Sequence, residues 1–322
     1  GNNSGQTVVG GAGDDTVNFT AEGGIAAGDL DITGGDGADV MNIDTNGFAF
    51  DASDDDVRFF ETYNVTLSGF DFTFESDDLA LEATSFVFTG NVGAGNTLKV
   101  EADADVNMSL SADLLEGATT DVEFEGGDDA VTLTAVSDIT AATVIYNDLG
   151  AGNDEVTLDL AGFDVAIDTT GNDIFSGIET LTVTGAATTA TTGAFFTFDV
   201  NDDFTTLDFS AVTNGVTLDA TDSDDITGIT IGTGASNISI GEVTSDLTLD
   251  VDLGDALIFL DTDGASTNLV TVENFADGSD SVALNGAAGS IANITDITAA
   301  GMAPCSTMPM PMPARRSTRW RC

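Results

Sequence analysis

The sequence lacks histidine and has very few basic residues. Its 322 residues include 6 Lys and Arg against 56 Asp and Glu, which gives a formal net charge of −50. Without histidine, His-based catalytic triads and His-ligated zinc cannot form. A surface this negative repels nucleic acids and anionic lipids, because both are bound through Lys and Arg. No apolar run approaches the roughly 20 residues that span a bilayer. We therefore expect no nucleic-acid partner and no membrane insertion.

Proline, cysteine and tryptophan are missing from residues 1–300, and all of them follow residue 301 together with four of the six basic residues. This break predicts that 301–322 is foreign to the fold, as an out-of-frame or fusion segment would be, or is a natural disordered tail. Translation of the coding DNA in its other frames would test the first idea, which requires Gly- and Asp-rich sequence to resume there. Because the chain begins with Gly1, we expect it to be part of a longer protein.

Glycine and aspartate are abundant instead. The chain has 37 Gly, 44 Asp and 42% hydrophobic residues. Asp is a poor former of helices and strands, and its side chain bonds backbone amides in turns, so most of the charge is expected at turns. The hydrophobic share is too large for a disordered acidic chain, and we expect a packed core.

Short runs in which apolar residues alternate with Thr, Ser or Asp predict β-strands with one buried face. Apolar pairs such as Leu207/Phe209 and Val216/Leu218 recur nine residues apart, and Val131, Val156 and Leu181 recur at 25. Nine residues are too few for a crossover helix. The repeats predict an all-β fold, a parallel β-solenoid of the β-roll or β-helix kind with Gly/Asp-rich turns. Tandem β-sandwich domains are the alternative, because they also give short, evenly spaced strands.

The composition divides the chain into four expected segments. Residues 1–45 are rich in Gly and Asp, 46–120 form an irregular β segment that could be a separate domain, 121–300 form the solenoid repeats, and 301–322 are the tail. The Phe residues of 70–74 and 86–88 alternate along predicted strands and are expected in the core.

Two nonapeptides, 10–18 and 34–42, fit the pattern G-G-x-G-x-D-x-U-x, in which U is a large apolar residue, at every fixed position. Glycine permits positive φ and close backbone approach, so that several carbonyl oxygens can converge, and Asp adds a charged oxygen. Ca²⁺ takes about 6 to 8 such oxygen ligands. The pattern therefore indicates a calcium site, with a metal-free Gly-Asp turn as the alternative.

These nonapeptides resemble the calcium-binding repeats of RTX proteins, which bacteria export by type I secretion. Residues 175–184 look like the "GIETLxVT" segment common in bacterial S-layer and large surface proteins, and 272–284 are similar to the segment that often closes an RTX array. The chain departs from the family because its perfect copies are not in tandem. They can meet only if one coil of the solenoid is as long as the separation between Gly10 and Gly34.

The resemblance implies a set of Ca²⁺ ligands. Asp15 and Asp39 are the expected carboxylate ligands. Weaker copies of the motif at 126–131 and 150–156 make Asp129 and Asp154 further candidates, and those at 171–175 and 278–282 add no residue to the set. The expected carbonyl ligands belong to the glycines of the two perfect motifs, Gly10, Gly11, Gly13, Gly34, Gly35 and Gly37.

The same resemblance implies an extracellular location at a bacterial cell surface, where the chain is a calcium-stabilised structural segment of an S-layer or similar array. The alternatives are the stalk of a type I secreted adhesin and the RTX region of a secreted enzyme. The expected partners are calcium ions and either further copies of the chain or other cell-surface proteins or polysaccharides. Salt adaptation would also explain the charge, but halophile surfaces gain Glu as well as Asp.

We expect no enzymatic activity from this chain. β-Helix polysaccharide lyases combine calcium with a basic residue, whereas only Arg58 and Lys99 lie outside the tail. Both are expected to be solvated ion-pair partners. With 56 acidic residues, carboxylate pairs arise by chance, so they do not indicate glycoside hydrolysis.

Overall fold

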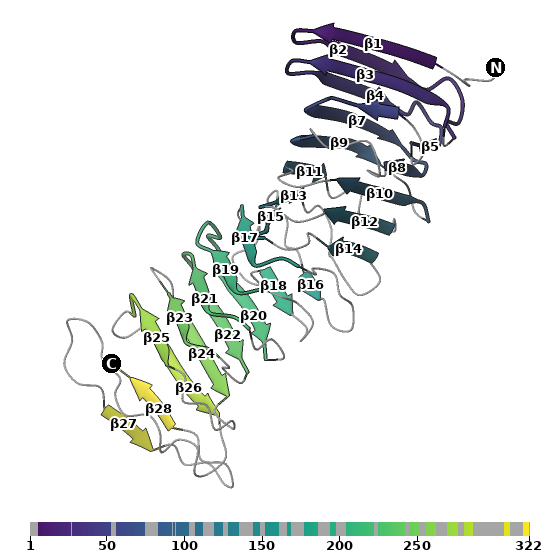
Figure 1. Ribbon diagram of the computed structural model, residues 1–322. Coiled ribbons are helices and arrows are strands. Elements are labelled where there is room, and N and C mark those ends of the chain that lie inside the picture. The colour runs from purple at the N-terminus through teal and green to yellow at the C-terminus, as the bar shows by residue number, and fades with distance from the viewer. Residues whose placement is uncertain are drawn as a thin grey trace. The chain divides into compact units, whose positions relative to one another are not determined.

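The computed structural model describes residues 6–26, 28–52, 56–74, 83–91, 93, 95–102, 107–111, 119–124, 128–134, 144–148, 152–160, 166–168, 177–185, 194–197, 204–221, 225–241, 245–251, 255–261, 269–275, 280–285, 306–309 and 318–321. Every regular element in these residues is a β-strand, and the strands of residues 6–285 stack in parallel as a β-solenoid (Figure 1). The predicted fold class is confirmed, and the tandem-sandwich alternative does not apply.

The chain forms two compact units. Unit 1 comprises 1–137, 141–158 and 174–179, and unit 2 comprises 138–140, 159–173 and 180–322. Within unit 1, the strands Thr62–Ser68, Ser85–Asn91 and Asn107–Ser111 come from the segment expected to be irregular. They continue the parallel order of the strands Thr16–Thr20 and Val40–Asp44. The four-segment division of the chain stays a prediction.

Unit 1 contains three series of strands, and neighbours within each series are hydrogen-bonded. The main series is β2 (Thr16–Thr20), β4 (Val40–Asp44), β7 (Thr62–Ser68), β9 (Ser85–Asn91), β11 (Asn107–Ser111), β13 (Ala130–Thr134) and β15 (Glu155–Asp159). A second series is β1 (Gln6–Ala12), β3 (Leu30–Asp36) and β6 (Asp56–Arg58). The third is β5 (Phe50–Asp51), β8 (Phe72–Phe74), β10 (Thr97–Ala102), β12 (Thr119–Phe124) and β14 (Val144–Asp148).

Unit 2 contains two series of strands. The first is β17 (Thr180–Thr184), β19 (Thr206–Phe209), β21 (Gly228–Ile231), β23 (Leu247–Asp250) and β25 (Val270–Glu273). The second is β16 (Ala166–Asp168), β18 (Ala194–Thr197), β20 (Val216–Ala220), β22 (Ser236–Ile240), β24 (Ala256–Asp261), β26 (Ser281–Asn285), β28 (Thr318–Arg321) and β27 (Ser306–Pro309). β28 runs antiparallel to both β26 and β27. Whether the tail is foreign to the fold stays a prediction.

The nine-residue repeat corresponds to half a coil of the solenoid. Leu207 of β19 pairs with Ile229 of β21, whereas Val216 lies in β20 of the other series. Apolar pairs nine residues apart therefore alternate between the two sheets. The stacking partner of each pair lies one full coil further along the chain, as Ile229 does from Leu207. The nine-residue spacing predicted a coiled fold. It is the distance between a strand of one sheet and the next strand in the other sheet, not the length of one full coil.

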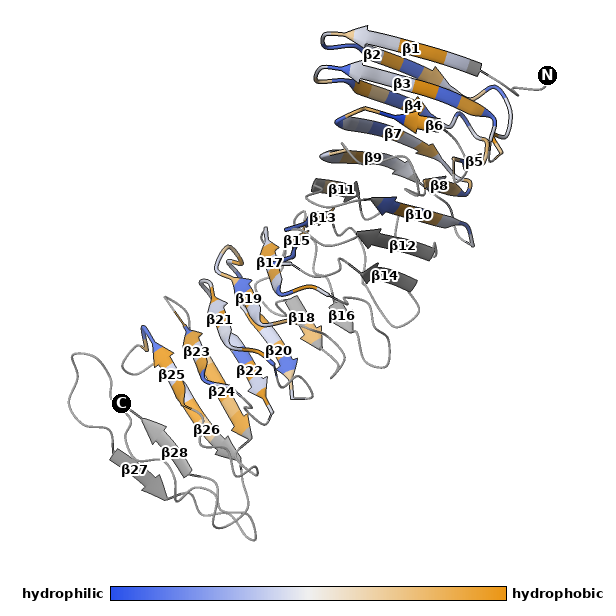
Figure 2. Cartoon of the chain, in the orientation of Figure 1, coloured by the Kyte–Doolittle hydropathy of each residue, from blue (hydrophilic) through white to orange (hydrophobic). Residues whose placement is uncertain are grey.

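The core is built from the inward-facing residues of each strand. Residues alternate between polar and apolar along the strands, as the hydropathy colours show (Figure 2). Phe50 stacks on Phe72 at 5.1 Å between ring centroids, and Tyr63 stacks on Phe86 at 5.1 Å. The prediction that the Phe residues form core is confirmed for Phe72, Phe74, Phe86 and Phe88, all of which are buried. It is wrong for Phe70, which is 47% exposed because it lies in the turn before β8.

Candidate metal centre

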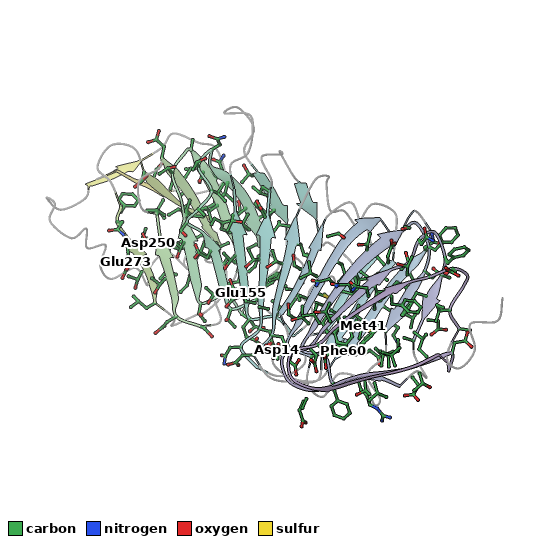
Figure 3. All side chains as sticks on the ribbon, turned by 90° about the horizontal axis from the view of Figure 1, so that it is seen from above. Asp14, Met41, Phe60, Glu155, Asp250 and Glu273 are labelled. Carbon is green, nitrogen blue, oxygen red and sulfur yellow. The ribbon has the colours of Figure 1, made fainter. Side chains whose placement is uncertain are left out.

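The two perfect nonapeptides meet across the first coil junction. One lies at the turn between β1 and β2, and the other at the turn between β3 and β4. The backbone N–H of Asp15 donates to Asp39 Oδ1 at 2.7 Å, and the N–H of Ala38 donates to Asp14 Oδ1 at 3.0 Å. Each motif thus supplies a carboxylate that accepts a backbone N–H of the other. Asp14 is labelled in Figure 3. The coil has the length of about 24 residues that this contact requires.

The glycines of the motifs allow neighbouring coils to approach closely. A Cβ on Gly10 would overlap the carbonyl oxygen of Gly34, and a Cβ on Gly35 would overlap that of Gly11. Gly37 faces the Gly13 carbonyl in the same way. Gly35 also has φ +117°, which favours glycine. The expected carbonyl ligands therefore lie against the adjacent coil.

The first glycine of each motif also makes room for its own Asp. A Cβ on Gly10 would lie 2.9 Å from Asp15 Oδ2, and one on Gly34 would lie 2.6 Å from Asp39 Oδ2. The carboxylate of each motif therefore packs against the backbone where the motif begins. This contact explains why the pattern combines Gly at its first position with Asp at its sixth, whether or not a metal binds.

Asp39 is the buried centre of a column of three acidic residues. Its side chain is 0% exposed. Its own backbone N–H donates to Glu61 Oε2 at 2.5 Å, so that Asp15, Asp39 and Glu61 are linked through successive coils. Within the described part of the chain, Asp39 Oδ2 has no hydrogen-bond partner. A buried carboxylate oxygen without a partner is costly unless a proton or a cation compensates it.

A second column in unit 1 repeats this arrangement. The N–H of Asp129 donates to Asp154 Oδ1 at 2.7 Å, and the N–H of Asp154 donates to Glu179 Oε2 at 2.8 Å. Asp128 Oδ1 accepts the N–H of Asn153 at 3.1 Å, as Asp14 does from Ala38. Asp154 is 0% exposed, and its Oδ2 also lacks a hydrogen-bond partner among the described residues.

Burial perturbs the second column electrostatically. It raises the pKa of Asp154 to about 6, and the charges of Asp129, Glu179 and Asp128 add to the increase. The hydrogen bond from the backbone of Asp129 acts in the opposite direction, because it favours the ionised form. The environment of Asp154 therefore favours binding of a positive charge.

The ten expected ligands fall at two separate junctions. The structure brings Asp15 together with Asp39, and Asp129 together with Asp154. The six glycines all lie at the first junction. The weak motif at 171–175 lies outside the described residues. So do residues 278 and 279 of the weak motif at 278–282. Asp280 of that last motif is buried and accepts the N–H of Ala256 at 2.8 Å.

Sequence reasoning missed Glu61 and Glu179, the third member of each column. A signal was present, because residues 61–66 read E-T-Y-N-V-T and residues 179–184 read E-T-L-T-V-T. Only the second copy matches the segment seen in surface proteins. Neither Glu follows a Gly-Asp turn, so neither was expected as a ligand.

The columns fit a hard cation only if backbone or water oxygens complete its shell. In the part of the chain that the structure describes, no group of three or more Asp, Glu, His or Cys side chains is arranged to hold a metal ion. The Oδ2 atoms of Asp39 and Asp154 nevertheless have no hydrogen-bond partner among the described residues, and carboxylate oxygen is a ligand that Ca²⁺ accepts.

Comparison of the chain with protein-family models, curated proteins and solved structures finds no match. Among the described residues, none forms a helix with the length and apolar character that a membrane crossing needs.

Proposed function

We propose that this chain is a structural segment of an extracellular array, such as a bacterial S-layer, and that Ca²⁺ joins its coils at the two carboxylate columns. One observation carries the proposal. Each column buries an Asp, Asp39 or Asp154, whose Oδ2 has no hydrogen-bond partner in the described residues. A cation is the compensation that a column of like charges favours, since a proton satisfies only one member.

The ligand set is oxygen only, which supports a hard cation. Asp39 and Glu61 supply carboxylates at the first column, and Asp154 and Glu179 supply them at the second. Ca²⁺ takes about 6 to 8 oxygens in flexible geometry, so carbonyls and water complete the shell. Extracellular calcium modules often have dissociation constants of about 10⁻⁴ to 10⁻³ M, which keeps them empty in a cytosol and filled outside.

A structural role is supported by the repeat itself. Stacked coils give a regular scaffold whose stability is a sum over neighbouring junctions. Lys99, one of two basic residues before the tail, forms an ion pair with Glu101 at 2.5 Å, and both side chains are half-buried. That no enzymatic activity is present stays a prediction.

Thermal unfolding of Asp39→Asn tests the proposal because the expected effect reverses sign with calcium. Asn keeps an oxygen for the N–H of Asp15 but removes the buried charge. In chelator the variant should melt at a higher temperature than the wild type, since the repulsion is relieved. In calcium it should melt lower, since binding only the folded state stabilises by RT ln(1 + [Ca]/Kd), about 2.7 kcal/mol at 100 times Kd.

Asp208→Asn is the matched control, because Asp208 bonds the nearby N–H of Ser210 and its strand neighbours are Thr182 and Thr230. It should respond to calcium as the wild type does. Sodium chloride at equal ionic strength separates binding from general screening. If calcium raises the melting temperatures of the wild type and of Asp39→Asn by the same amount, the columns are metal-free turns and the proposal fails.

A further inference from the structure

Phe59, in the turn between β6 and β7 of the third coil, has a backbone conformation that a bulky residue rarely adopts. Its φ is +61°, in the left-handed region. The other described non-glycine residues with positive φ are Asn46 and Asn274, whose short polar side chains tolerate that region. The Phe59 ring is 40% exposed, so its burial does not account for the strain. A strained backbone is typical of positions that hold a ligand group in place.

The carbonyl of Phe59 lies against the second coil, which contains β3 and β4. Arg58 of β6 pairs with Thr33 of β3. The register therefore places Phe59 beside Gly34. A Cβ on Gly34 would overlap the Phe59 carbonyl oxygen and would lie 2.6 Å from Asp39 Oδ2. The two oxygens thus border the same small space, which a side chain at residue 34 would fill.

The same arrangement occurs one coil earlier. A Cβ on Gly10 would overlap the carbonyl oxygen of Gly34 and would lie 2.9 Å from Asp15 Oδ2. Gly34 supplies this carbonyl without a positive φ, whereas Phe59 supplies the equivalent one from a strained backbone. The carbonyl keeps its place beside an Asp although the residue that carries it changes. The oxygen, rather than the Phe59 side chain, is therefore what the two junctions share.

Asp39 bonds to both neighbouring coils, and its Oδ2 is left without a hydrogen-bond partner among the described residues. Its Oδ1 accepts the N–H of Asp15 from the first coil. Its backbone carbonyl accepts the N–H groups of Glu61 and Thr62 from the third coil, each at 3.2 Å. A carboxylate oxygen and a carbonyl oxygen are both acceptors, so Oδ2 and the Phe59 carbonyl cannot satisfy each other. A cation between them, or a proton carried by Oδ2, satisfies both.

We propose that the cation of the first column binds between the second and third coils, with the Phe59 carbonyl and Asp39 Oδ2 among its ligands, a location that rests on the proposed function because the ion is the same. The site then extends to a coil that carries no G-G-x-G-x-D motif. Carbonyl and carboxylate oxygens are both ligands of Ca²⁺. The backbone of Phe59 fixes the direction of its carbonyl, and a ligand group that is fixed in advance lowers the conformational cost of binding.

Carbonyl NMR of the full chain tests this location, because Phe-Phe occurs only at 59–60 and 195–196 in the sequence. A chain with ¹³C at every Phe carbonyl and ¹⁵N at every Phe amide gives one HNCO signal for each pair. Addition of Ca²⁺ at constant ionic strength should shift the Phe59 carbonyl signal downfield in a saturable way. The Phe195 carbonyl, in β18 of unit 2, is the matched internal control and should not shift.

Gd³⁺ separates direct contact from a distant rearrangement, because its paramagnetic broadening falls steeply with distance. A small fraction of Gd³⁺ should erase the Phe59 signal before the Phe195 signal. In Asp39→Asn, an unchanged Phe195 signal reports that unit 2 is folded. The Ca²⁺ concentration at the midpoint of the Phe59 shift should rise about tenfold or more in this variant, because a charged ligand is lost.

The melting temperature distinguishes the possible failures. If Ca²⁺ raises the melting temperature of the chain while the Phe59 carbonyl signal stays in place, Phe59 is not a ligand, although the proposed function stands. If neither the melting temperature nor the signal responds to Ca²⁺, both proposals are wrong. Equal Ca²⁺ midpoints for the Phe59 shift in the wild type and in Asp39→Asn also overturn this location, because Oδ2 then takes no part in binding.

Discussion

Asp154 Oδ1 accepts the backbone N–H of Asp129 at 2.7 Å, and each of the two residues directly precedes a strand. The same bond joins Asp15 to Asp39, and in unit 2 it joins Ala256 to Asp280 at 2.8 Å. A short oxygen-bearing side chain before a strand therefore satisfies a backbone N–H of the previous coil. Glu61 and Glu179 make the same contact with a longer side chain, so the position before a strand accepts either acid.

Stability in the absence of calcium should depend on pH through Asp154. Burial, with the charges of Asp129, Glu179 and Asp128, raises its pKa to about 6 in the folded chain. The unfolded value is about 3.9. The folded state binds the proton more tightly, so this contribution is fully present below pH about 4 and is lost as pH rises through about 6.

Comparison with Asp154→Asn isolates this effect from the general repulsion among the acidic residues. In chelator, urea midpoints of the variant should fall less between pH about 4 and about 7 than those of the wild type. At the upper pH the variant should be the more stable protein. If the urea midpoints of the two proteins change in parallel with pH, the pKa of Asp154 is the same in the folded and unfolded chain and the prediction is wrong.

The close approach of coils predicts a large effect at Gly34. A Cβ there would overlap the carbonyl oxygen of Phe59 and lie 2.6 Å from Asp39 Oδ2. Gly34 has no positive φ, so the effect measures crowding alone. Gly34→Ala should lower the free energy of unfolding by about 1–3 kcal/mol. Gly23→Ala, which has open space, should change it by less than about 0.5 kcal/mol; similar urea curves for the two variants would contradict the tight junction.

The fold was predictable from the sequence to the extent that it depends on local periodicity. Alternation gave the strands, and motifs spaced by 24 residues gave a coil length at which Asp15 and Asp39 meet. The columns were not predictable in full, because Glu61 and Glu179 enter them through strand register rather than through a Gly-Asp turn. Phe70 shows the same limit: its alternation is that of a strand, but β8 begins only at Phe72.

An asparagine ladder on the outer face of β2, β4 and β7 should stabilise the first three coils. Asn42 Nδ2 donates to Asn18 Oδ1 at 2.8 Å, and Asn64 Nδ2 donates to Asn42 Oδ1 at 2.9 Å. Asn42→Ala removes both bonds and should lower the free energy of unfolding by about 1–2 kcal/mol. Asn42→Asp keeps the acceptor for Asn64 but not the donor to Asn18, so its stability should fall between those of the wild type and Asn42→Ala. Urea unfolding that ranks Asn42→Asp below Asn42→Ala would show that the ladder does not bear on stability.

Tyr63 should limit the stability of unit 1 at alkaline pH. Its ring is buried against Phe86, and its hydroxyl donates to the carbonyl of Val57 at 3.4 Å. Burial, with a smaller contribution from the charge of Glu61, raises the pKa of the phenol well above its ordinary value. The unfolded phenol titrates near pH 10, so stability is complete below about pH 10 and decreases above it as the unfolded state loses its proton.

Tyr63→Phe should cost at most about 1 kcal/mol at neutral pH, because the hydrogen bond is long. Above pH about 10 its urea midpoint should decline less than that of the wild type. A phenolate absorbance change for two tyrosines before unfolding, in a chain that has only Tyr63 and Tyr146, would show that the ring is accessible and would contradict the packing of Tyr63 in the core.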